Sequence, residues 1–300
     1  MPDPLPPSGP PPYRPPVEFL TRADGTRIFA GLSYALVSGY RPLQLDVWVP
    51  PAASPPPLVV WIHGGAWLSG DRRYLPETLR PNQLFDALGT AGLAVATVDY
   101  RHAREAPFPA QLHDVKAALR YLRAFAAELG VDAARAGVWG ESAGGHLAAL
   151  LALTAGRPDL EGDVGVPGRA GGVDAVVDWY GVADPDALHR MSAPDGAPPA
   201  QWDHPPDVLL AGADPATHAA AAPLRQVHSA APPFLLVHGT DDRLVPFAQS
   251  EALRAALSAA GVPVELVPVV GADHIFAGCP DIDELVTRSV RFLAHTLTSS

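Results

Sequence analysis

The sequence has little of what secreted, membrane-spanning or nucleic-acid-binding proteins require. Cys279 is the only cysteine among 300 residues, so no intrachain disulfide can form. No apolar run approaches the roughly 18 residues that span a bilayer, and no internal repeat is evident. Lys and Arg do not cluster, and the formal net charge is −11. Because nucleic acids and anionic membranes both attract basic patches, we expect neither as a partner.

The N-terminal segment also lacks the features of a signal peptide. Residues 1–16 are rich in proline and have neither a basic start nor an apolar core, so we expect no export signal and a cytoplasmic protein. Dense proline blocks helix and ladder hydrogen bonds, which predicts that residues 1–20 form either a loose tail or a strap over the site. The remaining segment, residues 21–300, is long enough and apolar enough to form a single domain.

The most informative motif is a serine flanked by small residues. Gly-Glu-Ser-Ala-Gly at residues 140–144 separates an apolar run from a helix-like stretch. A strand that turns directly into a helix has a strained backbone there, and small neighbours leave room for it. In the first helical turn the Ser142 hydroxyl would lie among unpaired backbone N–H groups, where the helix dipole favours negative charge. Ser142 is therefore a candidate nucleophile, although a capping serine gives the same pattern.

A serine nucleophile needs a base and a carboxylate that orients the base, and the chain supplies both. The apolar runs at residues 234–237 and 264–269 predict buried strands. Asp241 and Asp242 lie in the turn after the first run, and His274 follows the second. The order serine, acid, histidine is the one that α/β-hydrolases use.

With these positions the sequence resembles the α/β-hydrolase superfamily over residues 40–297. His-Gly-Gly-Ala-Trp at residues 63–67, after a predicted strand at 58–62, looks like the HGGxW oxyanion loop of esterases and kynurenine formamidases. Asp-Tyr-Arg at 99–101 and Pro-Phe-Pro-Ala at 107–110 extend the match. The chain is therefore similar to the α/β-hydrolase fold-3 and feruloyl-esterase-like (BD-FAE) groups.

The resemblance implies a role for each candidate residue. Ser142 would be the nucleophile and His274 the base. In such families the acid lies four residues after the histidine of the His-Gly turn, here His238, which favours Asp242 over its neighbour Asp241. No metal and no cofactor are implied.

The resemblance also implies that backbone N–H groups form the oxyanion hole. The expected donors are those of Gly65, Ala66 and Ala143, because glycine lets the backbone approach the substrate closely. Ala66 stands where many lipases of this class have a third glycine, and its methyl group restricts φ. His63 and His238 are expected to brace their loops.

Two further polar residues have alternative interpretations. Asp178 follows another strand-like run and could serve as a displaced triad acid, although a role in shaping the pocket floor is the favoured interpretation. Arg101 is expected to be a structural hydrogen-bond hub rather than a substrate ligand.

The alternation of strand-like and helix-like segments predicts an α/β-hydrolase fold, with a mostly parallel central sheet flanked by helices on both faces. Residues 43–49 alternate with period two, which predicts a half-exposed antiparallel edge strand. Residues 184–233 break the rhythm and predict a small cap-like insertion. Trp67, Glu141 and Trp202 are expected to line the substrate pocket, although Trp202 could instead belong to a small satellite core under a long surface loop.

These observations predict a serine hydrolase that cleaves small-molecule carboxylic esters with small to medium acyl groups through an acyl-enzyme. An arylformamidase similar to kynurenine formamidase, or an exopeptidase, could use the same groups. A hydrolase fold reused as a binding module without turnover is the distant alternative. The sequence does not specify an oligomeric state.

Overall fold

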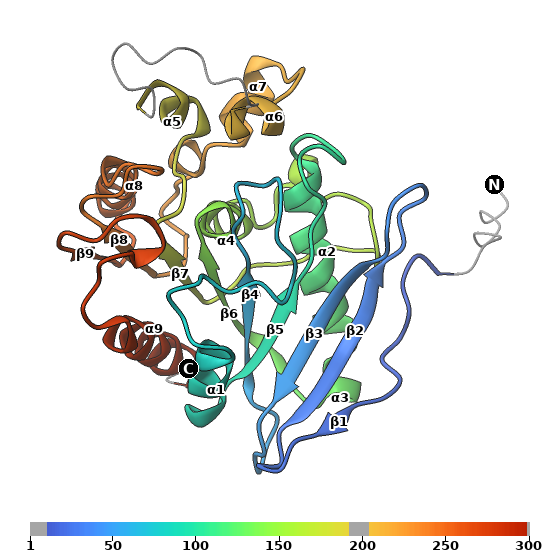
Figure 1. Ribbon diagram of the computed structural model, residues 1–300. Coiled ribbons are helices and arrows are strands. Elements are labelled where there is room, and N and C mark those ends of the chain that lie inside the picture. The colour runs from blue at the N-terminus through green and yellow to red at the C-terminus, as the bar shows by residue number, and fades with distance from the viewer. Residues whose placement is uncertain (1–10, 192–203, 299–300) are drawn as a thin grey trace, which may run out of the picture.

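The centre of the protein is a twisted nine-stranded sheet (Figure 1). The computed structural model describes residues 11–191 and 204–298, so the expected pocket residue Trp202 lies outside the described residues. The strand order across the sheet is β1-β2-β3-β5-β4-β6-β7-β8-β9. The strands are β1 (Leu20–Thr21), β2 (Arg27–Ala35), β3 (Leu43–Val49), β4 (Pro57–Ile62), β5 (Ala94–Val98), β6 (Asp132–Glu141), β7 (Ala175–Trp179), β8 (Phe234–Gly239) and β9 (Val264–Val269).

The sheet is mostly parallel, as the sequence predicts. Strands β5, β4 and β6 to β9 pair in parallel, whereas β1, β2 and β3 form an antiparallel end. The prediction that residues 43–49 form an edge strand is wrong, because β3 pairs with β2 on one side and β5 on the other. Its polar Asp46 is buried against the Arg72 guanidinium, with Nε and Oδ1 2.8 Å apart.

Helices cover both faces of the sheet and complete the expected α/β-hydrolase fold (Figure 1). On one face lie α2 (Ala110–Ala124), α3 (Ala126–Leu129), α4 (Ala143–Leu153) and α8 (Ala248–Ala259). On the other face lie α1 (Gln83–Thr90) and α9 (Ile282–Thr298). Among the described residues, no helix is long and apolar enough to cross a membrane.

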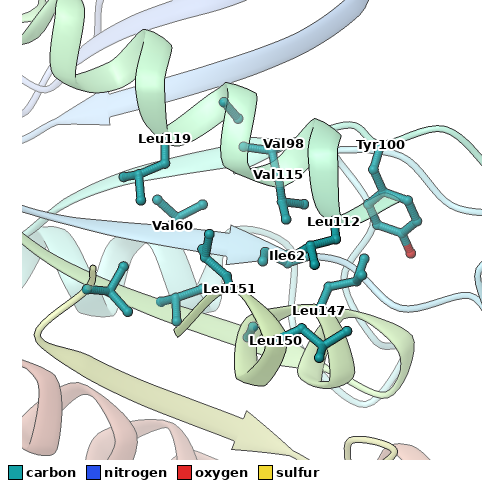
Figure 2. Close-up of a cluster of buried hydrophobic side chains, with 14 of the residues drawn as sticks. Val60, Ile62, Val98, Tyr100, Leu112, Val115, Leu119, Leu147, Leu150 and Leu151 are labelled. Atoms are coloured by element: carbon teal, nitrogen blue, oxygen red, sulfur yellow. The ribbon is translucent and has the colours of Figure 1, made fainter. Parts of the chain in front are cut away.

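Alternating side chains of β4 supply the two cores. Val60 and Ile62 point to the α2 and α4 face, and Val59 and Trp61 point to the α1 and α9 face. Figure 2 shows the first of these cores. Leu112, Val115 and Leu119 recur at helical spacing along α2, and they share this core with the leucines of α4. This packing fixes α4, and with it the serine that precedes the helix.

Three short helices lie within the predicted insertion: α5 (Pro185–Met191), α6 (Pro205–Leu209) and α7 (Pro215–Ala220). Figure 1 shows them gathered at one end of the molecule, away from α1 and α9. They are followed by the single turn η2 (Pro223–Arg225), whose Leu224 N–H donates to the Ala183 carbonyl. The insertion is thus attached near the end of β7.

Arg101 is the structural hub that the sequence predicts. Its guanidinium binds both carboxylate oxygens of Asp114, with Nη2 2.7 Å from Oδ1 and Nε 2.9 Å from Oδ2, and both residues are buried. We expect Asp114→Asn to lower the free energy of unfolding by about 3–5 kcal/mol, because it leaves Arg101 buried without its counter-charge. Chemical denaturation measures this change.

The matched control is Asp86→Asn, which breaks an ion pair with Arg22 whose two side chains are 50% and 39% exposed. An exposed pair contributes less than about 1 kcal/mol. If Asp114→Asn and Asp86→Asn lowered the free energy of unfolding by equally small amounts, the buried pair of Arg101 and Asp114 would not stabilise the loop after β5.

Candidate active site

Ser142 lies at the turn between β6 and α4, and its backbone is strained. Its φ is 53° and its ψ is −119°, a conformation that residues with a Cβ rarely adopt. The small neighbours are required by close packing, because a Cβ on Gly140 would lie 2.1 Å from the Gly144 carbonyl oxygen. A Cβ on Gly144 would lie 2.0 Å from the Ile62 carbonyl oxygen. The turn therefore holds the serine hydroxyl clear of the sheet.

The structure brings together the three residues whose order along the chain suggested a triad. The Nε2 atom of His274 lies 3.0 Å from Ser142 Oγ, and its Nδ1 atom lies 2.7 Å from Asp242 Oδ2. Because a carboxylate only accepts, Nδ1 carries the proton and Nε2 is free to accept one from the serine hydroxyl. Such an arrangement can deprotonate a serine and stabilise the resulting imidazolium.

Asp242 is held in its ionised form. Burial alone would raise the pKa of its carboxyl, but hydrogen bonds from His238 and His274 outweigh burial and hold the pKa well below its usual range. The backbone N–H groups of Leu244 and Val245 also donate to Oδ1. An ionised carboxylate at this position fixes both the tautomer and the orientation of the His274 ring.

His238 braces this turn, as expected from the sequence. Its Nε2 donates to the Val245 carbonyl over 2.8 Å and lies 3.3 Å from Asp242 Oδ2. Its Nδ1 therefore accepts from the Ser250 hydroxyl, 2.7 Å away. The ring thus connects the acid turn to α8.

Asp241 and Asp178, the two alternatives to Asp242 as the triad acid, make other hydrogen bonds in the structure. Asp241 is exposed and accepts a hydrogen bond from the hydroxyl of its neighbour Thr240 at 2.9 Å. Asp178 is buried, and its Oδ1 accepts from the Gly181 N–H at 2.8 Å. Burial raises the pKa of Asp178 to about 6. Among the described residues, Asp242 is the acid hydrogen-bonded to the His274 ring.

The loop after β4 has an unusual backbone. Gly65, Ala66 and Trp67 have φ values of 97°, 56° and 59°, all in the left-handed region. The Gly65 carbonyl is taken by the N–H groups of Leu68 and Ser69, at 2.9 and 3.1 Å. The N–H groups of Gly65 and Ala66 make no hydrogen bond within the described part of the chain. They remain free to bind a substrate oxygen.

The third expected donor is the backbone N–H of Ala143, the residue directly after the serine. Ala143 is the first residue of α4, so its N–H has no acceptor within the helix. The three expected donors thus belong to two segments, the loop after β4 and the start of α4. The loop contacts Glu141 and the helix begins directly after Ser142, so the two segments reach the residues on either side of Ser142 in the sequence.

Trp67 and Glu141 do not line an open pocket, contrary to the expectation from the sequence. Trp67 is 2% exposed and Glu141 is 1% exposed. The Glu141 carboxylate instead accepts from the Gly64 N–H, and the Trp67 indole N–H donates to His146 Nδ1 over 3.2 Å. These hydrogen bonds turn both buried side chains inward, Glu141 toward the loop after β4 and Trp67 toward α4.

Two supporting residues were not found by sequence reasoning. His146 on α4 joins the Trp67 indole to the insertion, since its Nε2 donates to the Ala221 carbonyl over 2.7 Å. Tyr180 follows β7 with a φ of 43°, and its ring lies edge-on to the His274 ring with centroids 4.9 Å apart. The only signal for Tyr180 was its place just after a buried strand.

Within the described ranges, no three or more His, Cys, Asp or Glu side chains are grouped so that they could hold a metal ion. The expectation that the protein uses neither metal nor cofactor stays a prediction.

Several known proteins are similar to this chain. Esterase LipQ of Mycobacterium tuberculosis (strain ATCC 25618 / H37Rv) is 33% identical over 245 residues, which cover 79% of this chain and 55% of LipQ. The solved structure of a truncated carbohydrate esterase from gut microbiota has a TM-score of 0.78 and 28% identity, covering 93% of this chain and 99% of its own. Butyrate-bound Est2, an esterase of Thermogutta terrifontis, has a TM-score of 0.67 and 27% identity, covering 88% and 93%.

The chain spans about half the length of the curated relatives it matches, with 55%, 58% and 47% of the first three covered. The family itself is shown by a broader match. The model of the BD-FAE family matches residues 45–257, which is more than half of the chain and includes Ser142 and Asp242. Fold, site geometry and family match agree, and the chain belongs to the BD-FAE family of α/β-hydrolases.

Proposed function

We propose that this protein is a serine hydrolase that cleaves carboxylic esters of small to medium acyl groups. The observation that carries the proposal is the chain of contacts from Ser142 through His274 to the buried, ionised Asp242, with distances of 3.0 and 2.7 Å. Similarity to proteins named as esterases supports the choice of ester over other acyl compounds.

The reaction follows from this geometry. His274 takes the Ser142 proton as Oγ attacks the ester carbonyl carbon, and the resulting oxyanion accepts hydrogen bonds from Gly65, Ala66 and Ala143. Collapse of this intermediate expels the alcohol, which receives the proton from His274, and leaves an acyl-enzyme. Water then attacks the acyl group with His274 again as base, and free acid and serine are regenerated.

We expect substrate choice to depend on acyl length. Est2 of Thermogutta terrifontis binds butyrate and propionate, which suggests a short acyl site here as well. Across p-nitrophenyl esters from acetate to decanoate, kcat/KM should be highest among the short esters and should fall for decanoate. An optimum at decanoate would contradict the proposed acyl size, although not the proposed chemistry.

The HGGxW loop also keeps arylformamide hydrolysis as a second candidate, because the same groups can attack a formamide carbonyl. We expect p-nitrophenyl acetate to be turned over with a higher kcat/KM than N-formylkynurenine. The reverse order would make the protein a formamidase with the same site residues.

Three further features are part of the proposal. The partner of the site is a small-molecule ester. Residues 184–233 form a cap-like insertion within a single domain that covers residues 21–300. A cytoplasmic location remains a prediction from the sequence.

A further inference from the structure

Glu141 is a buried carboxylic acid directly before the proposed nucleophile, and ester hydrolysis as described above gives it no task. Its Oε1 accepts the backbone N–H of Gly64 at 2.5 Å, although the two residues are 77 positions apart. A Cβ on Gly64 would lie 2.1 Å from the same oxygen. The glycine and the carboxylate are therefore packed directly against each other.

The contact between Glu141 and Gly64 holds the N–H side of the peptide between His63 and Gly64, and a second hydrogen bond holds its carbonyl side. The peptide between His63 and Gly64 donates its N–H to Glu141, and its carbonyl accepts from the Tyr100 hydroxyl over 3.0 Å. The same hydroxyl lies 3.1 Å from the Gly64 carbonyl. In a trans peptide the N–H points opposite to the carbonyl, so this second contact directs the Gly65 N–H away from Tyr100. Glu141 and Tyr100 together thus orient the first proposed oxyanion donor.

We propose that Glu141 is a positioning residue for the proposed ester hydrolysis: its ionised carboxylate anchors the oxyanion loop through Gly64, and its protonation lowers turnover. A hydrogen bond to a charged acceptor is roughly twice as strong as one to a neutral acceptor, so ionisation tightens the anchor. The negative charge also stabilises the imidazolium that forms on His274. This inference rests on the proposed function.

The surroundings of Glu141 place its titration near neutral pH. Burial raises its pKa to about 7, while His274, the Gly64 N–H and the Tyr180 hydroxyl favour the charged form. Its titratable neighbours in the described part of the chain are one histidine and three tyrosines: His274, Tyr74, Tyr100 and Tyr180. His274 is the one among them that can become cationic. Glu141 therefore loses its proton as the pH rises through about 7, and turnover rises with it.

The pH dependence of kcat/KM separates Glu141 from His274, which must also be neutral to act as base. Over the pH range in which both groups lose a proton, log kcat/KM of the wild type should rise with a slope of about two, because each loss raises turnover. Glu141→Gln keeps an oxygen acceptor for Gly64 but cannot ionise, so its slope should be about one. At a pH where wild-type Glu141 is ionised, kcat of Glu141→Gln should be more than about tenfold below that of the wild type, because its neutral hydrogen bond anchors the loop less tightly and the charge that stabilises the imidazolium is missing.

Loss of the anchor is tested by Glu141→Ala and Gly64→Ala, both of which remove the contact. We expect each to lower kcat for p-nitrophenyl acetate about 10²-fold with a smaller change in KM, since a displaced donor weakens transition-state binding. Thermal unfolding checks that the variants fold. Glu128→Gln, at an exposed position on α3, is the matched control and should retain the slope of about two.

The outcomes are distinct. A slope of about one in both wild type and Glu141→Gln overturns the inference, as does a folded Glu141→Ala variant with wild-type kcat. A wild type with no ester turnover above that of Ser142→Ala overturns the proposed function and this inference with it. Activity that depends on Ser142, with a slope of about two that Glu141→Gln reduces to about one, supports both.

Discussion

Ser142→Ala is expected to lower kcat for p-nitrophenyl acetate about 10⁶-fold, because the acyl-enzyme cannot form without the nucleophile. The residual rate comes from oxyanion binding and substrate positioning alone. Steady-state kinetics of the variant beside the wild type measure the loss. Ser258→Ala on the exposed side of α8 is the matched control and should keep wild-type kcat.

The same variant should fold normally, since removal of one hydroxyl leaves the packing of α4 against the sheet intact. Circular dichroism and the thermal unfolding midpoint check this. A Ser142→Ala protein that is folded and retains more than about a tenth of wild-type kcat would show that another residue attacks the ester.

Asp242→Asn is expected to have the second largest effect and to lower kcat about 10⁴-fold. The asparagine amide has the same shape, but its NH₂ group can donate to Nδ1 of His274. The proton would then move to Nε2, which could no longer accept from Ser142. Measurement of kcat at pH 7 to 8, where His274 must act as base, gives the size of the loss.

Asp241→Asn provides a neighbouring control for this substitution. Asp241 is exposed and bonds to Thr240, so its neutralisation should leave kcat within about twofold of wild type. If Asp241→Asn proved the costlier change, the assignment of the acid would be reversed.

Most of the candidate site could be predicted because its residues follow strands. In a parallel sheet the carboxyl ends of the strands meet at one edge, so loops after β4, β6, β8 and β9 are neighbours however far apart they lie in sequence. That reasoning, with the resemblance, selected Ser142, Asp242 and His274. In the structure, His274 lies between the other two residues, with Nδ1 2.7 Å from Asp242 Oδ2 and Nε2 3.0 Å from Ser142 Oγ.

The supporting contacts could not be predicted, because they join side chains that no local pattern connects. Glu141 meets Gly64 across 77 residues, and Trp67 meets His146 across 79. The sequence suggested that Trp67 and Glu141 line the pocket, since both adjoin candidate site residues. Which way such a side chain points depends on tertiary packing rather than on its position in the chain.

The wrong prediction for β3 has a related cause. Gln44, Asp46 and Trp48 alternate with apolar residues, as on a half-exposed edge. Asp46 is buried in the structure, where the guanidinium of Arg72 and the Gly31 N–H satisfy its carboxylate. A polar residue that is buried with its partners gives the same sequence pattern as one that faces water.

Covalent labelling tests the central claim most directly. We would treat the folded wild-type protein with a fluorophosphonate and locate the adduct by peptide mass spectrometry. The account predicts one adduct, on Ser142, formed rapidly in the wild type and in Asp241→Asn but very slowly in His274→Ala. A folded wild type that is not labelled, or that is labelled on another residue, would contradict the assignment of Ser142 as an activated nucleophile.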